Sequence, residues 1–401
     1  MPKYIPCILC WMLMFNMHIL AQESIKVNNK IPILFLPQGD VIRSMNGAGF
    51  NNSLYNHITN ISSSNPASLN DFNKMSAGLS FHFETSLKPA WLGLGNHERD
   101  QKYVPQSFGF VLPFKRWAVG FGFSQRYNSI LDFGKVAITT FNNPDSTEEY
   151  FTASKSNIVH SYSGLLSYAI HNVITKDDKI SAGLQYTYNS LRVEEQNYHT
   201  SLQATTNAMS WTAGLRYDLS NTVKLGLFYQ SGPSFKDKVT YKGDDSIFAV
   251  DSSNTPNNAY IIGPFTDFTY ALDDKMADKW HLGLVYQFNA STKITLEITQ
   301  VYRNQLARNA KNHIDISGGL IKHITDQLSY SISFLSTRPQ YNKETDRYFN
   351  TSENLYSFFL AGGLNIRLTF GDIDLAYATN TFSAGDWRKQ HLGKVAFGVY
   401  L

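Results

Sequence analysis

The side chains that could do chemistry in this sequence are not spaced as any familiar catalytic or metal-binding motif. Its histidines are scattered, and it contains no His-Glu-x-x-His pattern, nucleophile elbow or phosphate loop. The acidic pairs Asp244-Asp245 and Asp273-Asp274 could hold a divalent ion at a loop, although such pairs are usually just solvated. We therefore expect no catalytic residue, no metal site and no cofactor.

Both cysteines, Cys7 and Cys10, fall within the first 21 residues. This stretch has an early positive charge, a short apolar run from Ile5 to Leu20 and a small residue, Ala21, before a polar sequence. That pattern is typical of a secretory signal peptide over residues 1–21, and the alternative is an N-terminal membrane anchor. If the signal is removed, the mature chain has no thiol for disulfides, catalysis or zinc.

Composition narrows the classes that remain. The chain has 401 residues, of which 43% are hydrophobic and 17% charged, with a formal net charge of +3. The hydrophobic share excludes simple disorder, and the weak charge gives no electrostatic reason to expect a nucleic-acid partner. No apolar run after residue 21 is long enough for a spanning helix. A soluble exported protein and a β-barrel both remain open.

Apolar and polar residues alternate with period two along much of the chain. Between Ile180 and Asn189, for example, Ile, Ala, Leu, Tyr and Tyr alternate with Ser, Gly, Gln, Thr and Asn. Such alternation predicts half-buried antiparallel strands. We expect about fourteen strands, over residues 75–87, 106–114, 117–127, 157–171, 179–193, 207–218, 222–241, 266–288, 292–303, 313–323, 326–337, 354–369, 371–382 and 389–401.

The connections between these strands alternate in length. Short connections, such as 219–221 and 289–291, follow long ones, such as 128–156 and 242–265. A soluble sandwich has no reason to sort its loops by end, whereas a bacterial outer-membrane barrel has long external loops and tight periplasmic turns. The fold class expected is therefore all-β: a transmembrane antiparallel barrel at residues 75–401, contacting outer-membrane lipid, with both termini periplasmic. His281 and His391 lie on its strands and are expected to be lumen or interface groups.

Residues 22–74 do not alternate and are rich in Asn, Ser and Gly. A barrel of this size has a lumen that its own side chains are unlikely to fill, so we expect this segment to be a hatch or plug. A disordered tail or a periplasmic arm are the alternatives. The segment holds Gly47-Ala48-Gly49 and, directly before the first strand, Ser64-Asn65-Pro66-Ala67-Ser68-Leu69.

These two motifs, followed by a fourteen-strand pattern, resemble the FadL-type outer-membrane transport family. The resemblance implies an N-terminal hatch and passive uptake of hydrophobic molecules such as long-chain fatty acids. Its hatch residues would be Gly47, Gly49, Asn65, Pro66 and Ala67, with Asn-Pro-Ala either anchoring the hatch or forming a turn. The family often has a proline before its mid-chain strand, where this chain has Met276-Ala277-Asp278-Lys279, which makes the register there uncertain.

The resemblance also implies lateral release of the solute through the barrel wall, beside a kinked strand. In this chain we assign that strand to 117–127, in which Gly120 and Gly122 would face inward. Glycine within a strand marks either a bulge or a close approach, so these two residues form a wall kink or make room for the hatch. The sequence supports these two interpretations equally.

Two other functions are compatible with the same sequence. Some FadL relatives serve type IX-like protein secretion, in which case the long loops 128–156 and 242–265 would dock a secretion partner. A barrel enzyme could also assemble its site across strands, without any motif visible in the sequence. Uptake of a hydrophobic small molecule is the function we favour.

Overall fold

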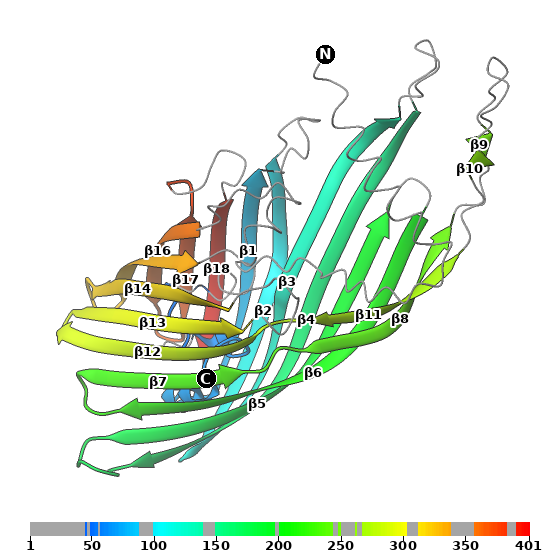
Figure 1. Ribbon diagram of the computed structural model, residues 1–401. Coiled ribbons are helices and arrows are strands. Elements are labelled where there is room, and N and C mark those ends of the chain that lie inside the picture. The colour runs from blue at the N-terminus through cyan, green and yellow to red at the C-terminus, as the bar shows by residue number, and fades with distance from the viewer. Residues whose placement is uncertain are drawn as a thin grey trace.

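Antiparallel strands form most of this protein, and they close into a barrel (Figure 1). The computed structural model describes residues 45, 49–54, 57–87, 99–138, 149–196, 200–243, 248–249, 261–262, 267–302, 312–337, 357–382 and 390–401. In these residues, no helix has the length and apolar character needed to cross a membrane. Two short 3-10 helices, η1 (Ile58–Asn60) and η2 (Pro66–Asp71), precede the first strand.

The barrel wall has fourteen strands, two of which are broken into halves. The broken strands are β7 with β8, and β11 with β12. The wall consists of β1 (Ser76–Leu87), β2 (Arg99–Phe114), β3 (Trp117–Ile138), β4 (Glu149–His171), β5 (Lys179–Gln196), β6 (Thr200–Asp218), β7 (Val223–Gln230), β8 (Ser234–Gly243), β11 (Phe268–Lys275), β12 (Asp278–Asn289), β13 (Thr292–Tyr302), β14 (His313–His323), β15 (Leu328–Thr337), β16 (Ser357–Arg367), β17 (Gly371–Thr379) and β18 (Gln390–Tyr400). The short β9 (Phe248–Ala249) and β10 (Ile261–Ile262) form a separate pair.

Neighbouring wall strands are neighbours in the sequence, and the last strand returns to the first. β18 pairs with β1, from Ser76 opposite Tyr400 to Ser86 opposite Gln390. The strands run from a turn end, where Ser76 and Tyr400 lie, to a loop end, where the connections are long. Because β1 and β18 are each paired on both edges, neither the first nor the last wall strand leaves a free sheet edge.

Several strands reach further toward the loop end than the sequence predicted. β3 continues to Ile138 and β4 begins at Glu149, so the predicted loop 128–156 is mostly strand. β2 and β6 likewise begin seven residues earlier than the predicted starts at 106 and 207. On β6 the alternation was hidden because the outward positions of the extension are polar. On β6, Gln203, Thr205 and Asn207 are exposed.

Two predicted strands are interrupted rather than continuous. The strand expected over 222–241 divides at 231–233 into β7 and β8, and the one expected over 266–288 divides at 276–277 into β11 and β12. The first break contains Pro233, which has no N–H to give to a ladder. The second break coincides with the Met276-Ala277 sequence where the register was uncertain.

The barrel is polar inside and apolar outside. On β5, Leu184 and Tyr186 are 62% and 61% exposed, whereas Gln185 and Thr187 between them are each 3% exposed. A soluble sandwich would show the opposite arrangement, because its apolar face must be buried. An outward apolar face over a polar interior is the arrangement that lipid surroundings favour.

The N-terminal segment is packed inside this wall at the turn end. η1 lies against β1 and β2, and η2 lies against β4, β5 and β6. Ile58, Ile61, Leu69 and Phe72 pack on inward residues of β2–β4. Met45 and Phe50 belong to another apolar cluster, formed with β15–β18. The described residues of this segment therefore pack against the inner wall.

Candidate functional site

The Asn65-Pro66-Ala67 sequence joins the segment in the lumen to the wall. Asn65 caps η2, since its Oδ1 accepts a hydrogen bond from the Ala67 N–H at 3.0 Å. Its Nδ2 donates to the carbonyl oxygens of Ser53 (3.2 Å) and Leu215 (3.0 Å), the latter on β6. The sequence predicted a turn or a hatch anchor here. The hydrogen bond to Ala67 is local, whereas the one to Leu215 reaches the wall.

Glycines in the wall make this contact close. An added Cβ at Gly183 would overlap the backbone of Pro66 and Ala67, and one at Gly214 would overlap Asn65 Oδ1. Both positions face the lumen, on β5 and β6. The Asn-Pro-Ala turn therefore lies in a shallow recess that larger residues would fill.

Gly49 also fits its place tightly. It has a φ of +90°, a conformation that favours glycine, and an added Cβ would overlap the Ser333 side chain on β15. Gly47 lies outside the described residues.

Charged side chains of the inner wall hold the same segment. The Glu297 carboxylate on β13 accepts three hydrogen bonds at 2.8 Å, from the Asn52 N–H, the Ser53 N–H and the Ser53 hydroxyl. Its other oxygen lies 3.1 Å from His281 Nδ1. Glu297 is 3% exposed, so these are buried charge-assisted contacts.

Further polar contacts surround the segment. Arg216 on β6 pairs with Asp71, and its Nε lies 2.7 Å from Asp218 Oδ1. Asp372 lies 3.2 Å from His57 Nε2, and Lys394 donates to Asn60 Oδ1. None of these charged wall residues was predicted from the sequence as a site residue. A usable signal was present, because each is a charged residue at an inward position of an alternating strand.

Gly120 and Gly122, the predicted wall-kink residues, lie in a regular part of β3. Both are paired with β2 and β4 without a shift of register. An added Cβ would come within 2.6 Å of Leu69 Cδ2 at Gly120 and 2.6 Å of Ser62 Oγ at Gly122. At both positions the N-terminal segment therefore approaches the backbone of β3 closely.

The wall does separate a little further along β3. β2 and β3 pair only from Phe114–Trp117 to Ser107–Ser124, and beyond that point β2 pairs with β1 and β3 with β4. Figure 1 shows β3 leaning away from β2 toward the loop end. Register shifts accompany the separation, at Ser80/Phe81 in the β1–β2 pair and at Gln125/Tyr127 in the β3–β4 pair.

A small cavity lined mainly by polar and charged residues lies beside this separation. Its lining includes Gln106 and Arg126 from the separating strands, Asn60 and Ser62 from the lumen segment, and charged residues of the opposite wall, namely Lys279, Glu297 and Asp315. The cavity therefore lies directly above the packed N-terminal segment, where polar and charged groups meet.

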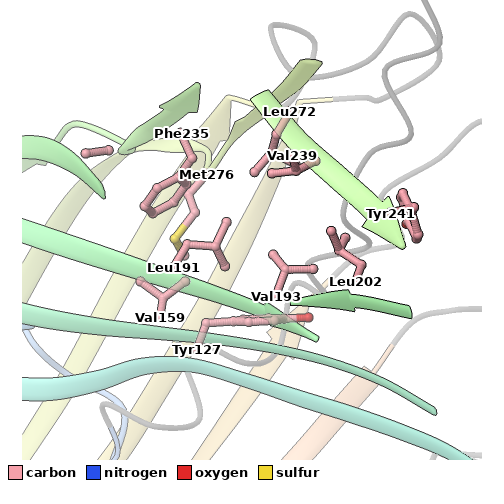
Figure 2. Packing of buried hydrophobic residues seen from close by; sticks show 11 residues of the cluster. Tyr127, Val159, Leu191, Val193, Leu202, Phe235, Val239, Tyr241, Leu272 and Met276 are labelled. Atoms are coloured by element: carbon pink, nitrogen blue, oxygen red, sulfur yellow. The ribbon is translucent and has the colours of Figure 1, made fainter. Parts of the chain in front are cut away.

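Toward the loop end the inner wall becomes apolar (Figure 2). On β5 the inward residues change from Gln185, Thr187 and Asn189 to Leu191 and Val193, all of them buried. We call the resulting group the upper apolar cluster. It consists of Tyr127, Val159, Leu191, Val193, Leu202 and Ala208 from β3–β6, with Phe235, Val239, Tyr241, Leu272 and Met276 from the chain between β7 and β12.

The remaining candidate residues do not lie together in one site. His281 faces the lumen, with its ring stacked 4.1 Å from that of Phe228, whereas His391 faces outward beside Tyr377. Asp244 and Asp245 lie outside the described residues. Within the described ranges, no group of three or more His, Cys, Asp or Glu side chains is arranged to hold a metal ion.

Comparisons with known proteins give structural matches without sequence matches. No family model matches the sequence, and no curated protein matches it significantly. The toluene transporter TbuX of Ralstonia pickettii is similar in structure, with a TM-score of 0.61 at 14% identity over 90% of this chain and 98% of that one. A FadL homologue from Pseudomonas aeruginosa gives 0.58 at 14% identity over the same two shares, 90% and 98%.

This chain has the FadL-type fold. The monoaromatic hydrocarbon channel CymD shares it, with a TM-score of 0.56 at 12% identity over 93% of this chain and 98% of that one. At such low identity the likeness concerns architecture, and the expectation of a fourteen-strand barrel of this type is confirmed.

Proposed function

We propose that this protein is an outer-membrane channel for passive uptake of hydrophobic molecules, with residues 22–74 as its hatch. The observation that carries the proposal is the layered lumen. An apolar cluster lies at the loop end, a polar cavity follows, and the packed N-terminal segment closes the turn end. A hydrophobic solute is stabilised in the apolar layer in proportion to the area it buries. The structural neighbours named as toluene transporters and a hydrocarbon channel support this solute class.

We further propose that the solute leaves sideways rather than through the hatch. Passage past Arg216, Glu297 and Asp372 would bring an apolar molecule against buried charges and would require the segment to release them. The separation of β2 from β3 offers a way out at the level of the cavity. It begins beside Phe108 and Phe121, which are exposed on the apolar outside, so a molecule released there would meet lipid.

Long-chain fatty acids are the first solute to test, and toluene is the second. The measurement is uptake of each labelled compound by cells with and without the gene, complemented by the intact chain or by a chain lacking residues 22–74. We expect uptake of each compound to fall when the gene is deleted. The intact chain should restore this uptake, whereas the chain lacking residues 22–74 should not. Unchanged uptake of both compounds on deletion would reject the proposal.

A role as a secretion partner has less support. That hypothesis relied on the long loops 128–156 and 242–265, and residues 128–138 and 149–156 of the first are strand. We propose no catalytic step.

A further inference from the structure

The barrel wall is interrupted in a second place, between β6 and β8. β6 pairs with β7 from Asp218–Lys224 to Thr212–Gln230. It then pairs with β8 only at Ser201–Lys242 and Thr200–Gly243. Both strands are fully described, and no ladder joins them from Leu202 to Trp211. We call this stretch, which spans about 30 Å at the usual strand rise, the β6–β8 seam.

The sequence at the break explains why the ladder stops. Ser231 occupies the edge of β6, because its N–H donates to the Trp211 carbonyl (2.9 Å) and its hydroxyl accepts from the Trp211 N–H (2.8 Å). The Gly232 N–H turns instead to Asp278 Oδ1 at 2.7 Å, and Pro233 has no N–H. The chain therefore leaves β6 at this point.

One extra residue at the break also reverses the inward positions. Gly226 and Phe228 are buried on β7, whereas Phe235 and Val239 are buried on β8, so even positions give way to odd ones. The inward positions of the returning strand reverse as well, since Leu272 is buried on β11, whereas Lys279 and His281 are buried on β12. The two breaks lie side by side, because the Met276 N–H donates to the Pro233 carbonyl at 3.0 Å. The hairpin of β8 and β11 is thus joined to the wall by two aligned breaks at one end and by the Ser201–Lys242 and Thr200–Gly243 pairs at the other.

Side chains close the seam in place of backbone hydrogen bonds. Phe235 and Met276 point toward Leu191 and Val159, which lie on the inner face of β5 and β4 next to β6, as Figure 2 shows. On β6 the inward seam residues include Ala204 and Ala208, which are small. Apolar contacts are not directional, so another apolar molecule can replace them without leaving a polar group unsatisfied.

The seam begins at the upper edge of the apolar outer surface. Met209 and Trp211 are exposed to 53% and 48%, and both face outward on β6. Beyond them the outward residues are Asn207, Thr205 and Gln203, all polar and exposed. The lower part of the seam is therefore adjacent to lipid, while its inner side is the upper apolar cluster.

We propose that the β6–β8 seam is the port through which a hydrophobic solute reaches the upper apolar cluster, with the β8–β11 hairpin hinging at 231–233 and 276–277. The port is distinct from the β2–β3 separation and lies on a different part of the wall. The inference rests on the proposed function. Until a solute enters, the apolar side chains of the hairpin fill the space that the solute would occupy.

A reversible staple across the seam tests this port. Asn207→Cys and Lys236→Cys place two thiols on outward positions of β6 and β8 that would face each other if the pairing Ser201–Lys242 continued. A short bifunctional methanethiosulfonate reagent can join them and a reductant can release them. Ile158→Cys with Arg192→Cys is the matched control. This pair lies across the hydrogen-bonded β4–β5 ladder, near the level of Asn207 and Lys236 along the barrel.

We expect the stapled seam to lose uptake of labelled toluene and fatty acid, and we expect reductant to restore it. The stapled control should take up both compounds at the rate of the untreated protein. Full uptake through a stapled seam would overturn the port, as would failure of the short reagent to join the two positions. Absence of uptake in the untreated wild-type protein would instead reject the proposed function, so the two failures are distinguishable.

Discussion

Glu297 illustrates how a single inward charge can organise the lumen. Its carboxylate accepts three hydrogen bonds from Asn52 and Ser53 while lying beside His281. Sequence alternation places Glu297 on the polar face of its strand, between Leu296 and Ile298. Alternation could not identify the hydrogen-bond partners of Glu297, because Asn52 is 245 residues away and reaches Glu297 only when the N-terminal segment packs inside the barrel.

Replacing this charge should loosen the segment. In Glu297→Gln, the amide oxygen can take the place of Oε2 and still accept the three donors, but the charge is removed. Because hydrogen bonds to a charged group are stronger than neutral ones, we expect a total cost of about 1.5–3 kcal/mol. We expect amide hydrogen exchange at Asn52–Leu54 to speed up by roughly ten- to a hundred-fold. Glu194→Gln, on β5 beside Arg192, is the control and should leave this exchange unchanged. Equal exchange in both variants would show that Glu297 does not hold the segment.

The glycine recess under Asn65 gives a second prediction at this scale. A methyl group at Gly214 would overlap Asn65 Oδ1, whereas one at Gly164 meets nothing within 4 Å. Overpacking of this kind costs about 1–3 kcal/mol. Gly214→Ala should therefore lower the temperature at which the folded barrel loses its compact electrophoretic mobility, relative to Gly164→Ala. Identical melting of the two variants would mean that the segment does not press on this wall.

At the scale of elements, the turn between β4 and β5 depends on one carboxylate. Asp178 accepts hydrogen bonds from the N–H groups of Val173 (2.7 Å), Ile174 (2.9 Å) and Thr175 (3.2 Å), and from the Tyr217 hydroxyl (3.2 Å). Burial alone would raise the pKa of Asp178, but these hydrogen bonds to the charged form together lower it. The ionised carboxylate thus satisfies amides that the turn would otherwise leave to water.

This turn should weaken in acid. Because the pKa of Asp178 is lowered on folding, its contribution is complete above the ordinary carboxyl pKa of about 4 and is lost as the pH falls through the lower folded value. Asp178→Asn should melt below the wild type at neutral pH, and the two should converge in acid. The neighbouring Asp177→Asn serves as the control. A difference between Asp178→Asn and the wild type that persists unchanged at all pH values would contradict this assignment.

The elements also show where sequence reasoning succeeds and where it stops. Period-two alternation located every wall strand, because outward apolar residues alternate with inward polar residues along each strand. It missed the break between β7 and β8, because alternation resumes after Ser231-Gly232-Pro233 with the opposite phase. It also ended β3 at 127 instead of Ile138.

At the scale of the whole molecule, the even number of strands fixes which parts share a side of the membrane. β1 begins and β18 ends at the turn end, opposite each other at Ser76 and Tyr400. The β4–β5 turn with Thr175 lies at that same end, while Gln196, at the far end of β5, lies at the loop end. In an outer-membrane barrel with periplasmic turns, Thr175 should face the periplasm and Gln196 the exterior.

Single cysteines can test this orientation, since the chain has no cysteine after residue 10. Thr175 and Gln196 are both exposed, so Thr175→Cys and Gln196→Cys should fold normally. An impermeant thiol reagent should label Gln196→Cys in intact cells and should label Thr175→Cys only after the outer membrane is permeabilised. The reverse pattern would invert the barrel. It would put the N-terminal segment at the external mouth, where it could not act as a hatch between the solute path and the periplasm.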